Sequence, residues 1–210
     1  MNPSGWTRGQ DELIRWQGLQ PGEGHVIKRS APRHGATWNV AFQTSVGTKL
    51  DAPRHRYEGA DDVAAIELNR LVLEGVVIDA RHALPGQQLQ WEDLRFPEHL
   101  AGLAVLVNFG WDRHWGTETY RSHPYVSREV ITRLCEAQIA LFGVDCSNVD
   151  STQDAERPAH TWFLRQRILI VENLTGLSAL QGRLFRFFAI PLKARDAAAF
   201  PVRAFAEVRE

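Results

Sequence analysis

Turn-forming residues and ionisable side chains are combined most densely in residues 45–55, Ser45-Val46-Gly47-Thr48-Lys49-Leu50-Asp51-Ala52-Pro53-Arg54-His55. Gly47 permits a tight backbone turn, and Pro53 fixes its own φ and favours an extended conformation at the residue before it. The segment is therefore predicted to be a rigid loop. Lys49, Asp51 and His55 supply a cation, an anion and a group that titrates near neutral pH, which suits acid–base chemistry. An ordinary surface loop with a Lys–Asp pair has the same composition and remains the alternative.

This segment resembles the signature of the cyclase family that includes bacterial kynurenine formamidase and isatin hydrolase, H-x-G-T-H-x-D-x-P-x-H. Matching residues stand at five positions of the signature: Gly47, Thr48, Asp51, Pro53 and His55. Ser45 and Lys49 occupy the positions of two histidines that, in the family, bind the divalent metal together with the aspartate. The resemblance therefore implies the family fold with an altered metal site.

Further segments resemble the same family in the same order along the chain. Residues 108–115 resemble its T-G-W strand end, residues 143–150 its G-x-D-x-x-S-x-D segment, and residues 168–177 its I-x-I-V-E-N-L-x-x-L segment. The resemblance extends over residues 38–208. It implies an α/β fold, the swivelling β/β/α domain of the cyclase family, in which a central mixed sheet has flanking helices.

The composition describes an ordinary globular protein. The chain has 210 residues, of which 44% are hydrophobic and 23% are charged, so we expect an irregular N-terminal arm over residues 1–36 and one cyclase-like domain over residues 37–210. Cys135 and Cys146 are predicted to be buried free thiols.

Net charge and hydropathy restrict the partners and the location. The net charge of −1 gives no strong field that would attract nucleic acid or a membrane surface, so a small-molecule substrate is the expected partner. Residues 1–20 lack the apolar core of a signal peptide, and no apolar run reaches bilayer-spanning length. We therefore expect a cytoplasmic protein, and the family resemblance implies a homo-oligomer such as a homodimer.

Hydrophobic periodicity predicts that helices and strands alternate along the domain. Strands are expected at residues 38–44, 72–80, 103–107, 144–146, 168–171, 184–191 and 200–208. Helices are expected at residues 11–17, 63–71, 129–142 and 158–166, with one helical turn at 91–94.

Candidate substrate-binding residues lie in the 45–55 segment and in an aromatic region further on: Ser45, Trp111, Trp115 and Tyr120. The simpler interpretation of any single one of these aromatic side chains is that it packs on the core. His160 and Glu172 match a histidine and a glutamate that the family contributes to its active site. Without the resemblance, a helix histidine bonded to a neighbour and a carboxylate in solvent would be the simpler interpretation.

A catalytic divalent metal needs about three protein ligands and an open position. A serine hydroxyl is a poor neutral ligand, and the ammonium of Lys49 has no lone pair and repels a cation. We therefore expect no metal and no other cofactor, with Lys49 supplying positive charge to an oxyanion. His55 is the expected acid or base, Asp51 its orienting partner or that of Lys49, and His160 with Glu172 a second proton-handling pair.

The leading hypothesis is an enzyme that cyclises, dehydrates or hydrolyses a small cyclic or aromatic carbonyl compound by metal-independent acid–base chemistry, in secondary metabolism such as natural-product biosynthesis. One alternative is a metal-dependent amide hydrolase of the kynurenine formamidase type, with a repositioned metal held by Asp51, His55, His160 and Glu172. Another is a non-catalytic binding protein that retains the pocket.

Overall fold

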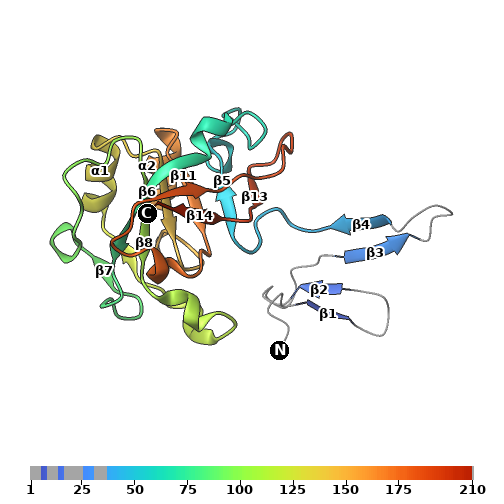
Figure 1. Cartoon of the computed structure of the whole chain (residues 1–210), viewed down its shortest axis with the longest axis horizontal. Helices are drawn as coiled ribbons and strands as arrows, with labels where there is room; N and C mark the ends of the chain where they lie inside the picture. Colours follow the sequence, from blue (N-terminus) through green and yellow to red (C-terminus); the bar gives the residue numbers. More distant parts are fainter. Residues whose placement is uncertain (1–5, 9–13, 17–25, 31–36, 210) are drawn as a thin grey trace.

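An eight-stranded mixed sheet forms the centre of the fold in the computed structural model, which describes residues 6–8, 14–16, 26–30 and 37–209 (Figure 1). The strand order is β13-β5-β11-β10-β8-β6-β12-β14. The bounds are β5 (Lys49–Asp51), β6 (Val72–Asp79), β8 (Ala104–Asn108), β10 (Leu141–Val144), β11 (Leu169–Glu172), β12 (Phe185–Phe188), β13 (Ala199–Pro201) and β14 (Phe205–Val208).

The four central strands, β6, β8, β10 and β11, are parallel, whereas two strands on each side pair antiparallel. Parallel strands need crossover connections, and two of these are helices, α1 (Arg128–Glu136) and α2 (Pro158–Arg165). Every residue of β8, β10 and β11 is buried, as expected for parallel strands covered on both faces. Their carboxyl ends meet at one edge of the sheet, where open α/β sheets place their ligands.

Two apolar clusters hold the sheet, one on each face. Val105 and Val107 pack with the helix side, together with Phe163 of α2, whereas Leu106 between them joins the opposite cluster with Phe185. This split follows from the two-residue period of a strand, which sends neighbouring side chains to opposite faces. Short apolar runs therefore supply both faces of the sheet with core residues.

Short elements surround the sheet. Two antiparallel hairpins precede it, β1 (Trp6–Arg8) with β2 (Ile14–Trp16) and β3 (Val26–Ser30) with β4 (Thr37–Ala41), and β7 (Gln88–Leu89) pairs with β9 (Tyr125–Val126). The 3₁₀ turns are η1 (Pro53–His55), η2 (Leu68–Arg70), η3 (Trp91–Asp93), η4 (Trp111–His114), η5 (Glu118–Arg121) and η6 (Leu177–Leu180).

The predicted fold class is confirmed, and several predicted elements have their expected positions. The strands at 103–107 and 168–171 correspond to β8 and β11, and the helix at 158–166 corresponds to α2. The predicted turn at 91–94 corresponds to η3.

Other predicted elements are wrong. Residues 63–71 form turns and the single 3₁₀ turn η2, in which the N–H groups of Arg70 and Leu71 bond to carbonyls three residues earlier rather than four. Helix α1 ends at Glu136, and Gln138 takes a left-handed φ of 55° that directs the chain into β10.

The ends of the chain also differ from the prediction. Residues 14–16 of the predicted helix 11–17 form strand β2, whereas residues 11–13 and 17 lie outside the described part. The predicted strand at 200–208 is divided into β13, which pairs with β5, and β14, which pairs with β12. No helix in the described part of the chain is long and apolar enough to cross a membrane.

Candidate functional site

The 45–55 segment enters the sheet as strand β5, and this strand aligns the ionisable residues. Lys49 and Asp51 lie two residues apart and therefore share one face of the strand. β5 pairs antiparallel with β11 so that Lys49 stands opposite Glu172. The register of two strands distant in sequence thus places one cation between two carboxylates.

Hydrogen bonds fix the loop before β5 to the end of β11. Thr48 Oγ1 donates to the carbonyl of Asn173 at 2.6 Å, and Asn173 Nδ2 donates to the carbonyl of Gly47 at 2.8 Å. Gly47 has a φ of 61°, a conformation that suits glycine. The turn predicted from Gly47 is therefore present and is held by the neighbouring strand.

Lys49 forms a buried ion cluster with the two carboxylates. Its Nζ lies 2.9 Å and 2.8 Å from the two oxygens of Asp51 and 2.6 Å from Glu172 Oε2. Burial alone would lower the pKa of Lys49, but Glu172 and Asp51 outweigh burial, and the pKa is raised above its ordinary 10.5. Burial would raise the pKa of Asp51, but Lys49 outweighs it and the pKa is lowered from 3.8. The lysine is thus a permanent ammonium and Asp51 a permanent carboxylate.

His160, from α2, lies behind this cluster and is 1% exposed. Its Nδ1 is 2.7 Å from Asp150 Oδ2, and its Nε2 is 3.5 Å from Asp51 Oδ2 and 3.6 Å from Glu172 Oε1. Asp150 also accepts the backbone N–H groups of Ala159 and His160 at the start of α2. Burial lowers the pKa of His160. The hydrogen bonds to Asp150 and Asp51 and the charge of Glu172 together raise it by more than burial lowers it, so the net shift is upward.

His55, from η1, faces the cavity and is the more exposed of the two histidines. Its side chain is 26% exposed, and Nδ1 lies 3.9 Å from Asp51 Oδ1. Its ring centroid lies 5.6 Å from that of His160. Burial, with the positive charge of Lys49, lowers the pKa of His55 in spite of the opposing effect of Asp51. His55 is therefore neutral at neutral pH, the state a proton acceptor requires.

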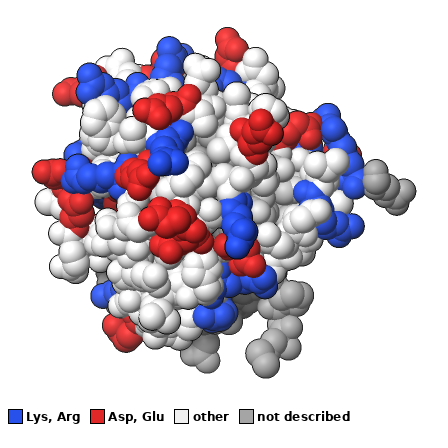
Figure 2. Space-filling model, turned by 90° about the vertical axis from the view of Figure 1, so that its left-hand side faces the viewer, with Lys and Arg blue, Asp and Glu red and all other residues white. Residues whose placement is uncertain are grey.

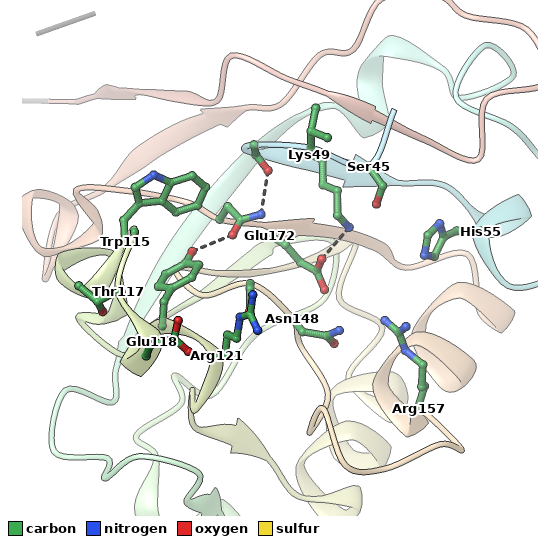
Figure 3. Close-up of a pocket in the computed structure, with 16 residues that line it drawn as sticks. Ser45, Lys49, His55, Trp115, Thr117, Glu118, Arg121, Asn148, Arg157 and Glu172 are labelled. Atoms are coloured by element: carbon green, nitrogen blue, oxygen red, sulfur yellow. Dashed lines mark hydrogen bonds and ion pairs between the residues drawn. The ribbon is translucent and has the colours of Figure 1, made fainter. Parts of the chain in front are cut away.

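A cavity of about 720 Å³ opens over these groups (Figure 3). Six of the residues predicted from the sequence line it: Ser45, Lys49, His55, Trp115, Tyr120 and Glu172. Asp51 and His160 are buried directly beneath them.

Two of the three aromatic residues predicted to bind substrate, Trp115 and Tyr120, line the cavity. Trp115 packs edge-on against Tyr120 with ring centroids 5.1 Å apart, and the Tyr120 hydroxyl donates to Asn173 Oδ1 at 2.7 Å. Trp111 does not line the cavity. It is 1% exposed in the core, where its Nε1 donates to the carbonyl of Tyr120 at 3.2 Å. Its predicted contact with substrate is therefore replaced by a packing role, as a large apolar ring favours.

Several residues of the site were not singled out from the sequence, among them Asp150, Arg157 and Asn173, and Glu118 and Arg121 on the cavity wall. Asp150 and Asn173 lie in the two segments that resemble the family, so their positions carried a signal that could have been used. Arg157 carried none. It has a left-handed φ of 50° immediately before α2, which periodicity does not predict.

The family resemblance implies a divalent metal, and the donor set can be tested for one. Ligand atoms of Asp51, His55 and His160 lie within 4.8 Å of one another. Both oxygens of Asp51 already accept from Lys49, so an ion about 2.1 Å from Asp51 would lie within roughly 5 Å of the ammonium. Repulsion between +2 and +1 at that separation is on the order of 7 kcal/mol at an effective dielectric constant of 20. This repulsion offsets part of the attraction that Asp51 and Glu172 would exert on the ion, so with Lys49 present the residues fit a divalent metal less well than they would with an imidazole at that position.

Charge outside the cavity is mixed. On the face shown in Figure 2, lysine and arginine alternate with aspartate and glutamate, and neither sign forms a continuous field. This distribution agrees with the net charge of −1.

Comparison with known proteins connects this arrangement to a family. The chain is 28% identical over 196 residues to a kynurenine formamidase of Bacillus mycoides, covering 92% of this chain and 91% of that protein. A kynurenine formamidase of Erythrobacter litoralis is 28% identical over 157 residues, covering 75% of this chain and 70% of that protein. Isatin hydrolase A from Labrenzia aggregata, solved with benzyl benzoate bound, superposes with a TM-score of 0.78 at 25% identity, covering 91% of this chain and 88% of that one. The family model described as "Putative cyclase" matches residues 10–151, more than half of the chain, and the protein therefore belongs to the cyclase family.

Proposed function

We propose that this protein is a metal-independent enzyme of the cyclase family that cyclises, dehydrates or hydrolyses a small cyclic or aromatic carbonyl compound. The observation that carries the proposal is the ammonium of Lys49, which lies between Asp51 and Glu172 and lines the cavity. It supplies a fixed positive charge at a position where the family resemblance implies a metal-ligating histidine.

Lys49 stabilises negative charge that develops on the carbonyl oxygen of the substrate. Its three N–H groups make three contacts, two with Asp51 and one with Glu172. One of these contacts must therefore break before Lys49 can donate a hydrogen bond to a substrate. The two contacts to Asp51 are made to a single carboxylate, and one of them can be given up while the ion pair remains. A buried, preorganised cation of this kind favours the transition state over the neutral ground state.

The two histidines handle protons on the two sides of Asp51. His55 is neutral and faces the cavity, so it takes a proton from the substrate or from an attacking water. His160 donates Nδ1–H to Asp150, which fixes its tautomer and directs Nε2 toward Asp51 and Glu172. His160 thereby orients Asp51 and holds a proton near the carboxylate that faces His55.

Turnover assays with and without chelator test the proposal. The first substrates are isatin, a cyclic amide, and an N-formyl aniline, an open-chain amide. We expect turnover of a cyclic or aromatic carbonyl compound to be unchanged by EDTA and to fall about a hundredfold in His55→Ala. Turnover that EDTA abolishes and zinc or manganese restores would contradict the proposal.

That contrary result would favour a metal-dependent amide hydrolase, for which one specific observation exists. Asp51, His55 and His160 lie close enough to share an ion, and relatives of this chain are named kynurenine formamidase. Binding of the ion would require Lys49 to leave Asp51. Whether Lys49 stays paired with Asp51 in the active protein therefore discriminates between the two functions.

A further inference from the structure

Arg157 lines the cavity, and no anionic side chain in the described part of the chain pairs with it. Its side chain is half-buried, and its Nη2 lies 3.1 Å from Nε2 and 3.3 Å from Nδ1 of His160. Among the side chains that the structure describes, residues 41–209, no carboxylate oxygen lies within 4.0 Å of its guanidinium.

The contact with His160 engages only Nη2 of the guanidinium. Nδ1 of His160 is engaged with Asp150, and Arg157 Nη2 lies almost equally far from both ring nitrogens, so the imidazole gives the guanidinium a ring contact and no anionic acceptor. A guanidinium has five N–H donors in a planar fork, and a partly desolvated cation without a counter-ion is unfavourable. By contrast, the exposed Arg128 nearby reaches Glu156 at 2.5 Å. The guanidinium of Arg157 can therefore bind an anion from outside the described chain.

We propose that Arg157 binds a carboxylate of the substrate, so that the substrate is an aromatic or cyclic carbonyl compound bearing one carboxylate. This inference rests on the proposed function and deepens it. In Figure 3, Trp115 lies on one side of the cavity and Arg157 on the other, with Lys49 between them. A planar substrate can thus place its ring toward Trp115, its reacting carbonyl at Lys49 and its carboxylate at Arg157.

The anion is a carboxylate rather than a phosphate because of the charges around it. The planar fork of a guanidinium matches a carboxylate through two parallel hydrogen bonds. Asp51 and Glu172, which lie 3.5 Å and 3.6 Å from His160 Nε2, and Glu118 on the cavity wall would repel a dianion more strongly than a monoanion. One guanidinium without a counter-ion balances one negative charge.

Calorimetric titration of the full chain with benzoate and its neutral isostere benzamide tests the inference. We expect wild type to bind benzoate at least about tenfold more tightly, the size of one charge-assisted hydrogen bond. This preference should disappear in Arg157→Gln and persist in Arg183→Gln, which removes an exposed arginine outside the cavity. If Arg157→Gln does not fold, Arg157→Lys should keep part of the preference because it keeps the charge without the fork.

Several results would overturn the inference. One is equal affinity of wild type for benzoate and benzamide. Another is a preference for benzoate that survives in Arg157→Gln, or that is lost in Arg121→Gln but not in Arg157→Gln. A third is tighter binding of inorganic phosphate than of benzoate. The readout is binding and not turnover, so the inference and the proposed reaction can fail separately. A preference that depends on Arg157 in a protein whose turnover needs a metal would retain this inference and refute the metal-independent mechanism.

Discussion

Replacing Lys49 with methionine tests the buried ion cluster, because methionine keeps the unbranched stem of the side chain up to Cε and removes the ammonium. Asp51 is 0% exposed and Glu172 is 1% exposed, so the variant leaves two carboxylates buried without their cation. Breaking a buried ion pair by removing one partner costs about 3–5 kcal/mol. For a chain of this size, that loss lowers Tm by roughly 10 °C.

The pH dependence of the loss identifies its cause. The pKa of Asp51 is below its ordinary 3.8, so its pairing stabilises the fold above that pH and is lost as the pH falls. The pKa of Lys49 is above 10.5, so its pairing is present below that pH and is lost as the pH rises. The difference in free energy of unfolding between wild type and Lys49→Met should therefore be largest near neutral pH and shrink toward pH 4, where Asp51 of the variant, buried without its cation, takes up a proton.

Urea denaturation followed by circular dichroism, at pH 7 and at pH 4, measures this difference. The matched control is Arg81→Met, which removes an equally short but exposed pair with Asp79 at 2.7 Å and should leave the free energy of unfolding nearly unchanged. If Lys49→Met unfolds within about 1 kcal/mol of wild type at pH 7, far below the cost expected for a broken buried pair, then the cluster is not a buried, ionised pair and the reasoning fails.

Three further measurements follow from the site and the core. His55→Ala should lower kcat about a hundredfold while the protein keeps its fold, and wild-type turnover in the folded variant would remove His55 from the mechanism. The pH profile of kcat/KM should rise through a pKa below 6.5, set by His55, and fall through a pKa above 6.5, set by His160; a profile that first rises above pH 7 would contradict these directions. Gly143→Ala should destabilise the fold by about 1–3 kcal/mol in urea denaturation, because a Cβ there would lie 2.6 Å from Leu106 Cδ2 and 2.9 Å from Leu174 Cδ1. Unchanged stability would show that the two leucine side chains move aside and would contradict this prediction.

The parts of the fold that were predicted correctly depend on local sequence. Strand β11 is an uninterrupted apolar run, and α2 begins with proline at its first position, so both could be recognised without tertiary information. The failed helix at 63–71 shows the limit of this reasoning. Residues 63–71 form turns instead, and the Val63 N–H bonds to the carbonyl of Ala197. A partner so distant in the sequence cannot be predicted from local pattern.

The candidate site divides in the same way. That Lys49 and Asp51 share a face follows from the period of a strand, but the position of Glu172 opposite Lys49 depends on the register between β5 and β11. Glu172 and His160 were chosen through the family resemblance rather than through spacing. Arg157 could not be chosen because its place at the cavity depends on a left-handed backbone conformation before α2.

The most direct test of the central claim, that the ammonium of Lys49 replaces the catalytic metal, is elemental analysis of the purified protein beside the double variant Ser45→His with Lys49→His. The double variant restores two imidazoles next to Asp51 and removes the repelling charge, so it should take up about one zinc or manganese per chain and lose native activity. Wild type should contain no stoichiometric metal, even after incubation with zinc. One metal ion per chain in wild type would contradict the claim.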